Sequence, residues 1–135
     1  MTTILQNDGE ILDNNISSIS DFFQLMKPRV MSLVIFTALI GYFCGVFSTE
    51  TILNPYLSMI GILAIALGAG SSGVLNQWYD RDVDSMMERT KNRPIPKGKI
   101  EPSDALAFGL IGSILSIVIL GLCINWLAGF LLFFT

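Results

Sequence analysis

The sequence contains no histidine and only two cysteines in 135 residues. Without histidine, the chain has no imidazole for acid–base catalysis or for binding a metal ion. Cys44 and Cys123 both lie in apolar runs, and two cysteines are too few to indicate a redox compartment. We interpret both as small buried apolar side chains rather than as a disulfide.

Charged residues are scarce as well. Asp, Glu, Lys and Arg make up 14% of the chain, compared with about 25% in soluble globular domains. Apolar residues make up 52%, and the mean hydropathy is +0.62. This composition is typical of a membrane protein, so we expect the lipid bilayer as a partner. The net charge of −3 is less informative than its distribution along the chain, and nucleic acid is not an expected partner.

Basic residues are absent from positions 1–26, which contain four acidic residues. A secretory signal requires a basic start followed by an apolar core, and neither is present. We therefore predict that residues 1–26 form a soluble N-terminal tail. The end of this tail carries apolar residues that suit a short amphipathic helix at the membrane interface. They are Phe22, Phe23, Leu25 and Met26.

Three long stretches that are nearly free of charge follow. We place membrane spans at about 29–47, 55–77 and 105–124, because about 20 residues cross a hydrocarbon core of about 30 Å. Trp126 favours the membrane–water interface, so we place a break before it and a partial span at 126–135. The sequence thus predicts an all-α fold, a multi-pass transmembrane helical bundle of three spans with a truncated fourth.

The eight Lys and Arg residues fall into two groups, at positions 27–29 and in the loop 80–104. Two spans separate these groups, so both lie on the same side of the membrane. Loops rich in Lys and Arg remain in the cytoplasm. We therefore predict that the N-terminus and the loop 80–104 are cytoplasmic.

Three oxygen-bearing side chains stand where the second span ends. Asn76, Asp80 and Asp84 are four residues apart, so on a helix they share one face. Two carboxylates at this spacing repel each other. A divalent cation removes the repulsion, and Mg²⁺ prefers oxygen ligands. The spacing therefore predicts a site for Mg²⁺ and a diphosphate at the membrane surface, whereas Asp82 points to the opposite side of the helix.

Basic residues follow within fifteen positions of Asp84. Arginine binds phosphate oxygens in bidentate fashion, and lysine acts as a point charge. Metal-bound acids beside phosphate-binding bases suit the ionisation of an allylic diphosphate, because both stabilise the leaving group. The candidate diphosphate-binding residues are Arg89, Lys91, Arg93 and Lys97, with Lys99 in the same loop.

Small residues form a stripe along the second span, at Ala64, Gly68 and Ser72, and lead to Asn76. Such a stripe allows close packing against a neighbouring helix, and it also leaves room for a prenyl chain or another flat apolar substrate. The two interpretations are compatible.

Other interpretations of the polar loop remain open. The acids alone suit a solvated helix end, and the basic residues alone suit setting the topology or binding anionic headgroups. A calcium loop is excluded, because Ser85 stands at its glycine position and Lys91 at its terminal glutamate position.

The pattern Asn76-x-x-x-Asp80-x-x-x-Asp84 resembles the first aspartate-rich motif of the intramembrane prenyltransferases, the UbiA superfamily. Two further runs resemble its protohaem IX farnesyltransferase (haem O synthase) branch, and the similarity extends from about residue 21 to 135. These runs are Lys27-Pro28-Arg29-Val30 and Arg89-Thr90-Lys91-Asn92-Arg93-Pro94-Ile95-Pro96-Lys97-Gly98.

The resemblance implies a bundle of nine spans around a central cavity, in the cytoplasmic (inner) membrane of a bacterium. It implies transfer of a farnesyl group from farnesyl diphosphate to a vinyl group of protohaem IX, which gives haem O. Asn76, Asp80 and Asp84 would be the catalytic residues that carry Mg²⁺ and the diphosphate. Arg93 and Lys97 would be the foremost phosphate contacts, followed by Arg89 and Lys91.

The chain also departs from this family. Members are about twice as long, and a second aspartate-rich motif on a later helix completes their metal site. We therefore interpret residues 27–135 as the N-terminal part of the domain and expect it to be inactive alone; a separate chain that supplied the missing spans would restore activity. Alternative interpretations are a UbiA-type enzyme with a quinone or tetrapyrrole acceptor, and a non-catalytic membrane remnant or accessory protein.

Overall fold

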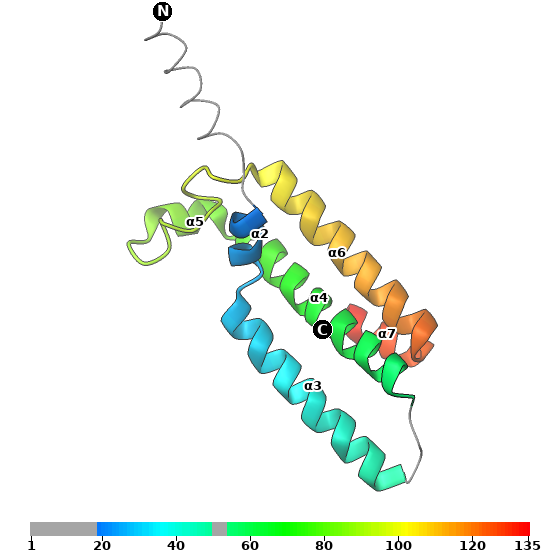
Figure 1. Cartoon of the computed structure of the whole chain (residues 1–135). Coiled ribbons are helices and arrows are strands. Elements are labelled where there is room, and N and C mark those ends of the chain that lie inside the picture. The colour runs from blue at the N-terminus through cyan, green and yellow to red at the C-terminus, as the bar shows by residue number, and fades with distance from the viewer. Residues whose placement is uncertain (1–18, 50–53) are drawn as a thin grey trace, which may run out of the picture.

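The computed structural model describes residues 19–49 and 54–135, and every regular element in these two ranges is an α-helix (Figure 1). This confirms the predicted all-α fold. Most of the predicted soluble tail lies outside the described residues. The helices are α2 (Ile19–Leu25), α3 (Pro28–Thr49), α4 (Pro55–Tyr79), α5 (Arg81–Met86), α6 (Pro102–Cys123) and α7 (Trp126–Phe134).

The helices α3, α4 and α6 are long and apolar enough to cross a membrane, with 22, 25 and 22 residues. At 1.5 Å per residue they are about 33–38 Å long, which exceeds a hydrocarbon core of about 30 Å. Each begins at a proline, because proline suits a first helical turn, where its missing N–H has no partner in any case. At the start of α4, Asn54 caps the helix by accepting a hydrogen bond from the Tyr56 N–H at 3.1 Å.

These three helices alternate in direction, and α7 folds back beside α6 (Figure 1). Most side chains on α3 face outward, since none of its residues is buried. Cys44 and Cys123 are free and exposed on α3 and α6, so our interpretation of them as buried is wrong. A cysteine is apolar enough to lie on a lipid-facing surface.

Small residues bring α4 and α6 close together. The Ser71 hydroxyl of α4 packs against Gly112 of α6, and the Ser116 hydroxyl of α6 packs against Gly68 of α4. Both hydroxyls are fully buried, and neither has a hydrogen-bond partner among the residues that the structure describes. Ala64 is buried as well, so two members of the predicted small-residue stripe, Ala64 and Gly68, serve helix packing.

A tight turn separates α6 from α7. Asn125 caps α7 by accepting a hydrogen bond from the Leu127 N–H at 3.2 Å, and Trp126 is exposed. Gly121 and Gly129 allow the reversal, because a Cβ atom on Gly129 would lie 2.9 Å from the Gly121 Cα. This close approach sets α7 against the last turn of α6.

A small apolar core lies at the end where the charges gather. Leu25 of α2 packs there with Val74 of α4, Ala105 of α6 and two loop residues, Ile95 and Ile100. The helix α2 contains three of the four residues predicted for the membrane interface, with Met26 in the turn that follows, but its Leu25 is fully buried against protein. The helix therefore fastens the loop to the ends of α4 and α6.

The turn between α2 and α3 needs one unusual residue. Lys27 has φ +51°, a left-handed conformation that costs about 1–2 kcal/mol for an L-residue. Its N–H donates to the Gln24 carbonyl at 3.1 Å, and its own carbonyl accepts from the Val30 N–H at 2.9 Å. One residue thus ends α2 and starts α3.

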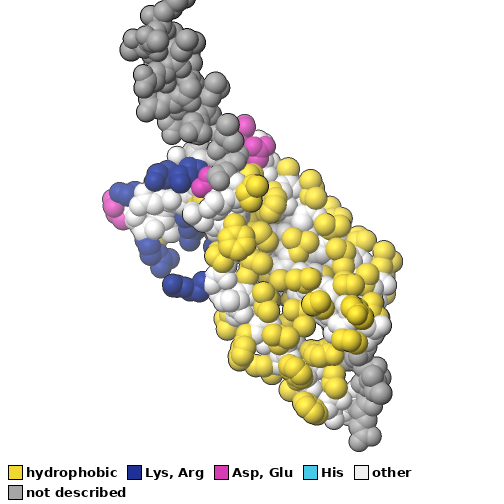
Figure 2. Space-filling model, in the orientation of Figure 1, with side chains coloured by type: hydrophobic (Ala, Val, Ile, Leu, Met, Phe, Trp, Pro, Cys, Tyr) yellow, Lys and Arg dark blue, Asp and Glu magenta, His cyan; other side chains and the backbone are white. Residues whose placement is uncertain are grey.

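The charged side chains of residues 19–49 and 54–135 lie at the same end of the molecule. In Figure 2, Lys, Arg, Asp and Glu side chains gather around α5 and the following loop, whereas apolar side chains cover the visible face of the long helices. The three apolar spans and this distribution identify an integral membrane protein.

Candidate functional site

The acidic residues stand where α4 turns into α5. The helix α4 ends at Tyr79, and Asp80 has φ −85° and ψ 2°, so the helix is interrupted there. Two backbone hydrogen bonds nevertheless bridge the interruption: the Asp80 N–H donates to the Asn76 carbonyl at 3.0 Å, and the Asp84 N–H donates to the Asp80 carbonyl at 2.8 Å. The three predicted ligands therefore remain one turn apart, although they do not lie on one continuous helix.

These three side chains differ in their surroundings. Asn76 is exposed, Asp80 is half-buried, and Asp84 is only 5% exposed. In the described part of the chain, the Asn76 amide and the Asp80 carboxylate make no hydrogen bond or ion pair. Both are therefore free to bind a ligand.

The buried carboxylate of Asp84 is held by the loop. Arg93 Nη1 lies 2.6 Å from Asp84 Oδ2, and the Thr90 hydroxyl donates to the Asp84 carbonyl at 3.0 Å. A buried charge requires a partner of opposite sign, and Arg93 supplies it. The structure thus brings a predicted phosphate contact against a predicted metal ligand.

Apolar anchors explain why the loop folds over the acids. Ile95 and Ile100 are buried in the core beneath α2, and turns join the Arg93 N–H to the Thr90 carbonyl and the Lys97 N–H to the Arg93 carbonyl, each at 3.0 Å. Gly98 has φ +77°, a conformation that glycine adopts without strain. The loop is therefore a fixed structure that presents Arg93 to Asp84.

The other predicted phosphate contacts lie at the surface. Lys91 pairs with Glu88 at 2.7 Å, and both side chains are largely exposed. Arg89 and Lys97 are exposed and form no ion pair within residues 19–49 and 54–135. Exposed pairs contribute at most about 1 kcal/mol, so all three side chains can turn toward an anion.

Two residues between the predicted metal ligands have structural roles that the sequence did not reveal. Gln77 is 3% exposed, and its Nε2 donates to the Leu25 carbonyl at 2.6 Å, which joins α4 to α2. Arg81 stacks on Trp78 with 4.8 Å between the guanidinium carbon and the ring centre, and it donates to the Trp78 carbonyl at 2.8 Å. Thr90 was missed in the same way, because a polar residue in a polar loop carries no burial signal.

The donor set fits Mg²⁺ bound together with a diphosphate. Magnesium usually takes one or two protein carboxylates and completes its shell with phosphate oxygens and water. Asp80 and Asp84, with the Asn76 amide oxygen, match this requirement. No group of three or more Asp, Glu, His or Cys side chains gathers to hold a metal in the part of the chain that the structure describes, so the site does not resemble a closed metal cage.

An apolar cavity of about 540 Å³ starts at Leu75, next to Asn76. We call it the proximal cavity. Ser72, the third member of the small-residue stripe, lines the part of the cavity nearer to Asn76. Gly68 and Ile65 continue the lining along α4. Side chains from α3, α6 and α7 line the other sides of this partly open cavity, among them Val34, Ile114, Ile117 and Leu132.

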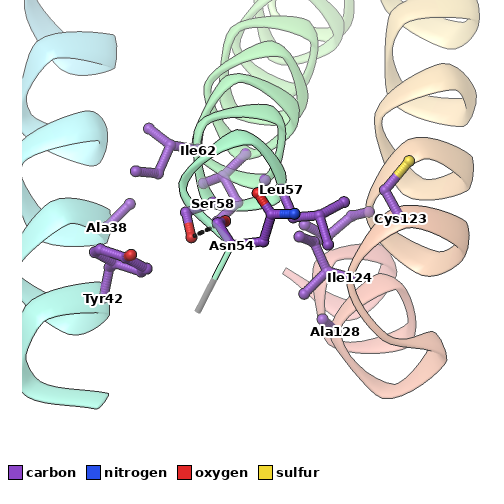
Figure 3. A pocket seen from close by; sticks show the side chains of 12 residues that line it. Ala38, Tyr42, Asn54, Leu57, Ser58, Ile62, Cys123, Ile124 and Ala128 are labelled. Carbon is purple, nitrogen blue, oxygen red and sulfur yellow. Dashed lines mark hydrogen bonds between the residues drawn. The ribbon is translucent and has the colours of Figure 1, made fainter. Parts of the chain in front are cut away.

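A second cavity, the distal cavity, has a volume of about 340 Å³ and lies at the opposite end of the long helices (Figure 3). Ala38 and Tyr42 approach it from α3, and Ile62 approaches it from α4. Ile124 and Ala128 line it from the turn before α7 and from α7. Its lining is mainly aliphatic.

Comparison with protein families matches residues 34–135 to the UbiA prenyltransferase family. The chain is 54% identical over 132 residues to the protoheme IX farnesyltransferase of Rhizobium johnstonii, and the alignment covers 98% of this chain and 40% of the relative. It is 56% identical over 119 residues to that of Sinorhizobium fredii, which covers 88% of this chain and 36% of the relative. For Rickettsia felis the identity is 49% over 124 residues, with 92% and 39% covered.

No solved structure gives a significant match. The chain spans about 40% of the length of the curated relatives it matches. The family match nevertheless covers three quarters of the chain, including the acidic residues, the loop and both cavities. The chain belongs to the UbiA prenyltransferase family.

Proposed function

We propose that the chain supplies the diphosphate site and the tail cavity of an enzyme that transfers a farnesyl group to protohaem IX to give haem O. One observation carries this proposal: the side of α4 that lines the proximal cavity at Gly68 and Ser72 continues one turn on to Asn76, and Asp80 follows one turn later, just past the end of the helix. A charged head and an apolar tail can therefore lie along the same helix. The names of the relatives supply the acceptor and the length of the tail.

Asn76, Asp80 and Asp84 would hold the Mg²⁺ that accompanies the diphosphate. When bound, the ion neutralises the diphosphate and stabilises the charge that develops as it leaves. Arg93 stands beside Asp84 at 2.6 Å, so it is placed to share its donors between this carboxylate and a phosphate oxygen. Lys97, Arg89 and Lys91 would add positive charge from the loop.

The proximal cavity would hold the farnesyl tail. A cavity of about 150 Å³ binds benzene, and by that ratio a fifteen-carbon tail needs about 380 Å³. The proximal cavity, at about 540 Å³, is large enough. An apolar enclosure also keeps water away from the carbocation that forms at C1 when the C1–O bond breaks.

The distribution of charge supports an orientation of the site in the membrane. The basic residues that the structure describes all lie at the end with α2, α5 and the loop. We infer that this end faces the cytoplasm of a bacterial cell, because basic loops remain on that side. Soluble diphosphates and Mg²⁺ are available there.

A chimera tests the activity directly. The N-terminal part of the Rhizobium johnstonii relative is replaced by this chain, to which it is 54% identical, and membranes that lack haem O are supplied with protohaem and farnesyl diphosphate. Chromatography with mass detection should reveal farnesylated haem. A product formed only from a quinone precursor, or no product where the intact relative is active, would refute the proposed acceptor or the proposed reaction.

Site variants then test the residues. Asp80→Asn and Asp84→Asn should each lower the rate of farnesyl transfer by at least about 100-fold, as expected for charges that stabilise a transition state. Asp82→Asn is the matched control, since Asp82 is an exposed acid outside the proposed metal site, and it should retain activity. Equal effects of all three substitutions would argue against a specific site.

A further inference from the structure

The two cavities meet at a single residue. Ile65 lines both the proximal and the distal cavity, and it is the one residue that they share in the described part of the chain. The proximal cavity follows α4 from Leu75 to Ile65, and the distal cavity follows it from Ile65 to Leu57. Ile65 therefore stands at the boundary between two spaces arranged end to end.

The length of the proximal cavity suits one class of tail. Leu75 and Ile65 are ten residues apart, which corresponds to about 15 Å along the helix. This is close to the length of an extended farnesyl tail. A tail whose head lies at Asn76 and Asp80 would thus reach its end at Ile65, and a longer tail would have to pass this side chain.

The side chain is suited to act as a stop. Isoleucine is branched at Cβ, and in a helix about 90% of isoleucine side chains adopt one χ1 rotamer. Ile65 cannot swing aside as easily as an unbranched side chain would. Space for a longer tail nevertheless exists beyond it, because the distal cavity has a volume of about 340 Å³.

The distal cavity is chemically suited to a hydrocarbon. Two of its polar side chains are already engaged: the Asn54 side-chain oxygen accepts from the Tyr56 N–H at 3.1 Å, and the Ser58 hydroxyl donates to the Asn54 carbonyl at 3.1 Å (Figure 3). Most of the remaining lining is aliphatic, with Ile62 and Ile124 facing the space. Hydrocarbon would therefore meet few unsatisfied polar groups there.

We propose that Ile65 sets the length of the prenyl tail that this chain accepts. With Ile65 present, the proximal cavity takes a farnesyl tail; with a smaller residue, the two cavities join and take a longer prenyl diphosphate. This inference rests on the proposed function, because it assumes that a diphosphate head lies at Asn76 and Asp80.

Binding measurements on the whole chain in lipid nanodiscs test the inference. The probes are unreactive thio-analogues of geranyl, farnesyl and geranylgeranyl diphosphate with Mg²⁺, measured by calorimetry. The unsubstituted chain should bind the farnesyl analogue at least about tenfold more tightly than the geranylgeranyl analogue, since one unaccommodated methylene already costs about tenfold or more. Ile65→Ala should reduce this preference to less than about threefold.

Two further variants keep the test specific. Ile62 lies on the same helix but lines only the distal cavity. Ile62→Ala removes the same atoms as Ile65→Ala, so it should leave the preference for farnesyl unchanged. Ile65→Phe should weaken binding of the farnesyl analogue at least about fivefold while geranyl binding is retained, because the stop then stands closer to the head. Thermal unfolding in the same nanodiscs checks that each variant is folded.

The possible results separate the two proposals. If the farnesyl analogue binds with Mg²⁺ but Ile65→Ala leaves the preference unchanged, or if Ile62→Ala changes it equally, the role of Ile65 is refuted and the proposed function stands. If no prenyl analogue binds more tightly than inorganic diphosphate, the tail site itself is refuted and the proposed function falls with it.

Discussion

The ion pair between Arg93 and Asp84 gives the sharpest prediction about stability. The Asp84 side chain is 7% exposed and the Arg93 side chain is 30% exposed. Arg93→Gln leaves a buried carboxylate without its cation, a change that costs about 3–5 kcal/mol in a fully buried pair. Because Arg93 is partly exposed, water can replace part of its interaction with Asp84. We therefore expect a loss of about 2–3 kcal/mol in the free energy of unfolding.

The reverse substitution should cost less. Asp84→Asn leaves Arg93, whose guanidinium can reach solvent and regain hydration, so we expect a loss of about 1 kcal/mol. The double variant should lose little more than Asp84→Asn alone, which corresponds to a coupling energy of about 2–3 kcal/mol. The order of the two single variants therefore follows from their difference in burial.

Unfolding by a graded denaturing detergent is followed in all four proteins by the fluorescence of Trp78, which packs against the apolar core that anchors the loop. Hydrogen exchange of the loop amides shows whether a loss of stability is local to the loop or global. A coupling energy near zero, or a larger loss for Asp84→Asn than for Arg93→Gln, would contradict the interpretation that Arg93 stabilises a buried carboxylate.

Three further predictions concern helix packing. Gln77→Leu removes the buried hydrogen bond to the Leu25 carbonyl at 2.6 Å and should cost about 1–3 kcal/mol, with faster hydrogen exchange in α2; unchanged exchange would contradict this role. Gly112→Ala places a methyl group against Ser71 and should cost about 1–3 kcal/mol, and Ser71→Gly in the same protein should recover most of it in thermal unfolding. Ser116→Ala removes a buried hydroxyl that has no hydrogen-bond partner in the described ranges, so the melting temperature should stay the same or rise; a clear fall would reveal an unrecognised partner.

The membrane spans could be predicted because hydrophobic length is a local property of the chain. A run without charge must find an apolar environment, and proline at Pro28, Pro55 and Pro102 marks where each helix starts. The reversal near Trp126 was predicted for a related reason, since Asn125 and Trp126 are polar and interfacial residues inside an apolar run.

The interruption at Asp80 could not be predicted, because neither proline nor glycine marks it. The sequence placed Asn76, Asp80 and Asp84 at helical spacing, and the backbone hydrogen bonds preserve that spacing. The angle between α4 and α5 depends instead on the loop that packs against them, a tertiary effect that the local sequence does not report.

The contact between Arg93 and Asp84 was missed for a similar reason. Both residues were predicted as ligands of one substrate, and nothing in their nine-residue separation indicates that they pair with each other. The pairing depends on Ile95 and Ile100, which enter the core beneath α2. Two isoleucines in an otherwise polar loop were the available signal that the loop packs against a core. From the sequence, we interpreted the loop only through its basic residues.

The core that joins Leu25 to Ile100 and Ala105 has a consequence for biosynthesis. These residues are separated by up to eighty positions along the chain, so a ribosome adding about 5–20 residues per second needs about 4–16 s to complete the set. Until Ala105 has been synthesised, the apolar core against which α2 packs is incomplete. Late in this interval, once α4 has been made, the nascent chain therefore holds two apolar helices and an acidic turn that is not yet packed against the loop, and insertion factors or proteases can engage it there.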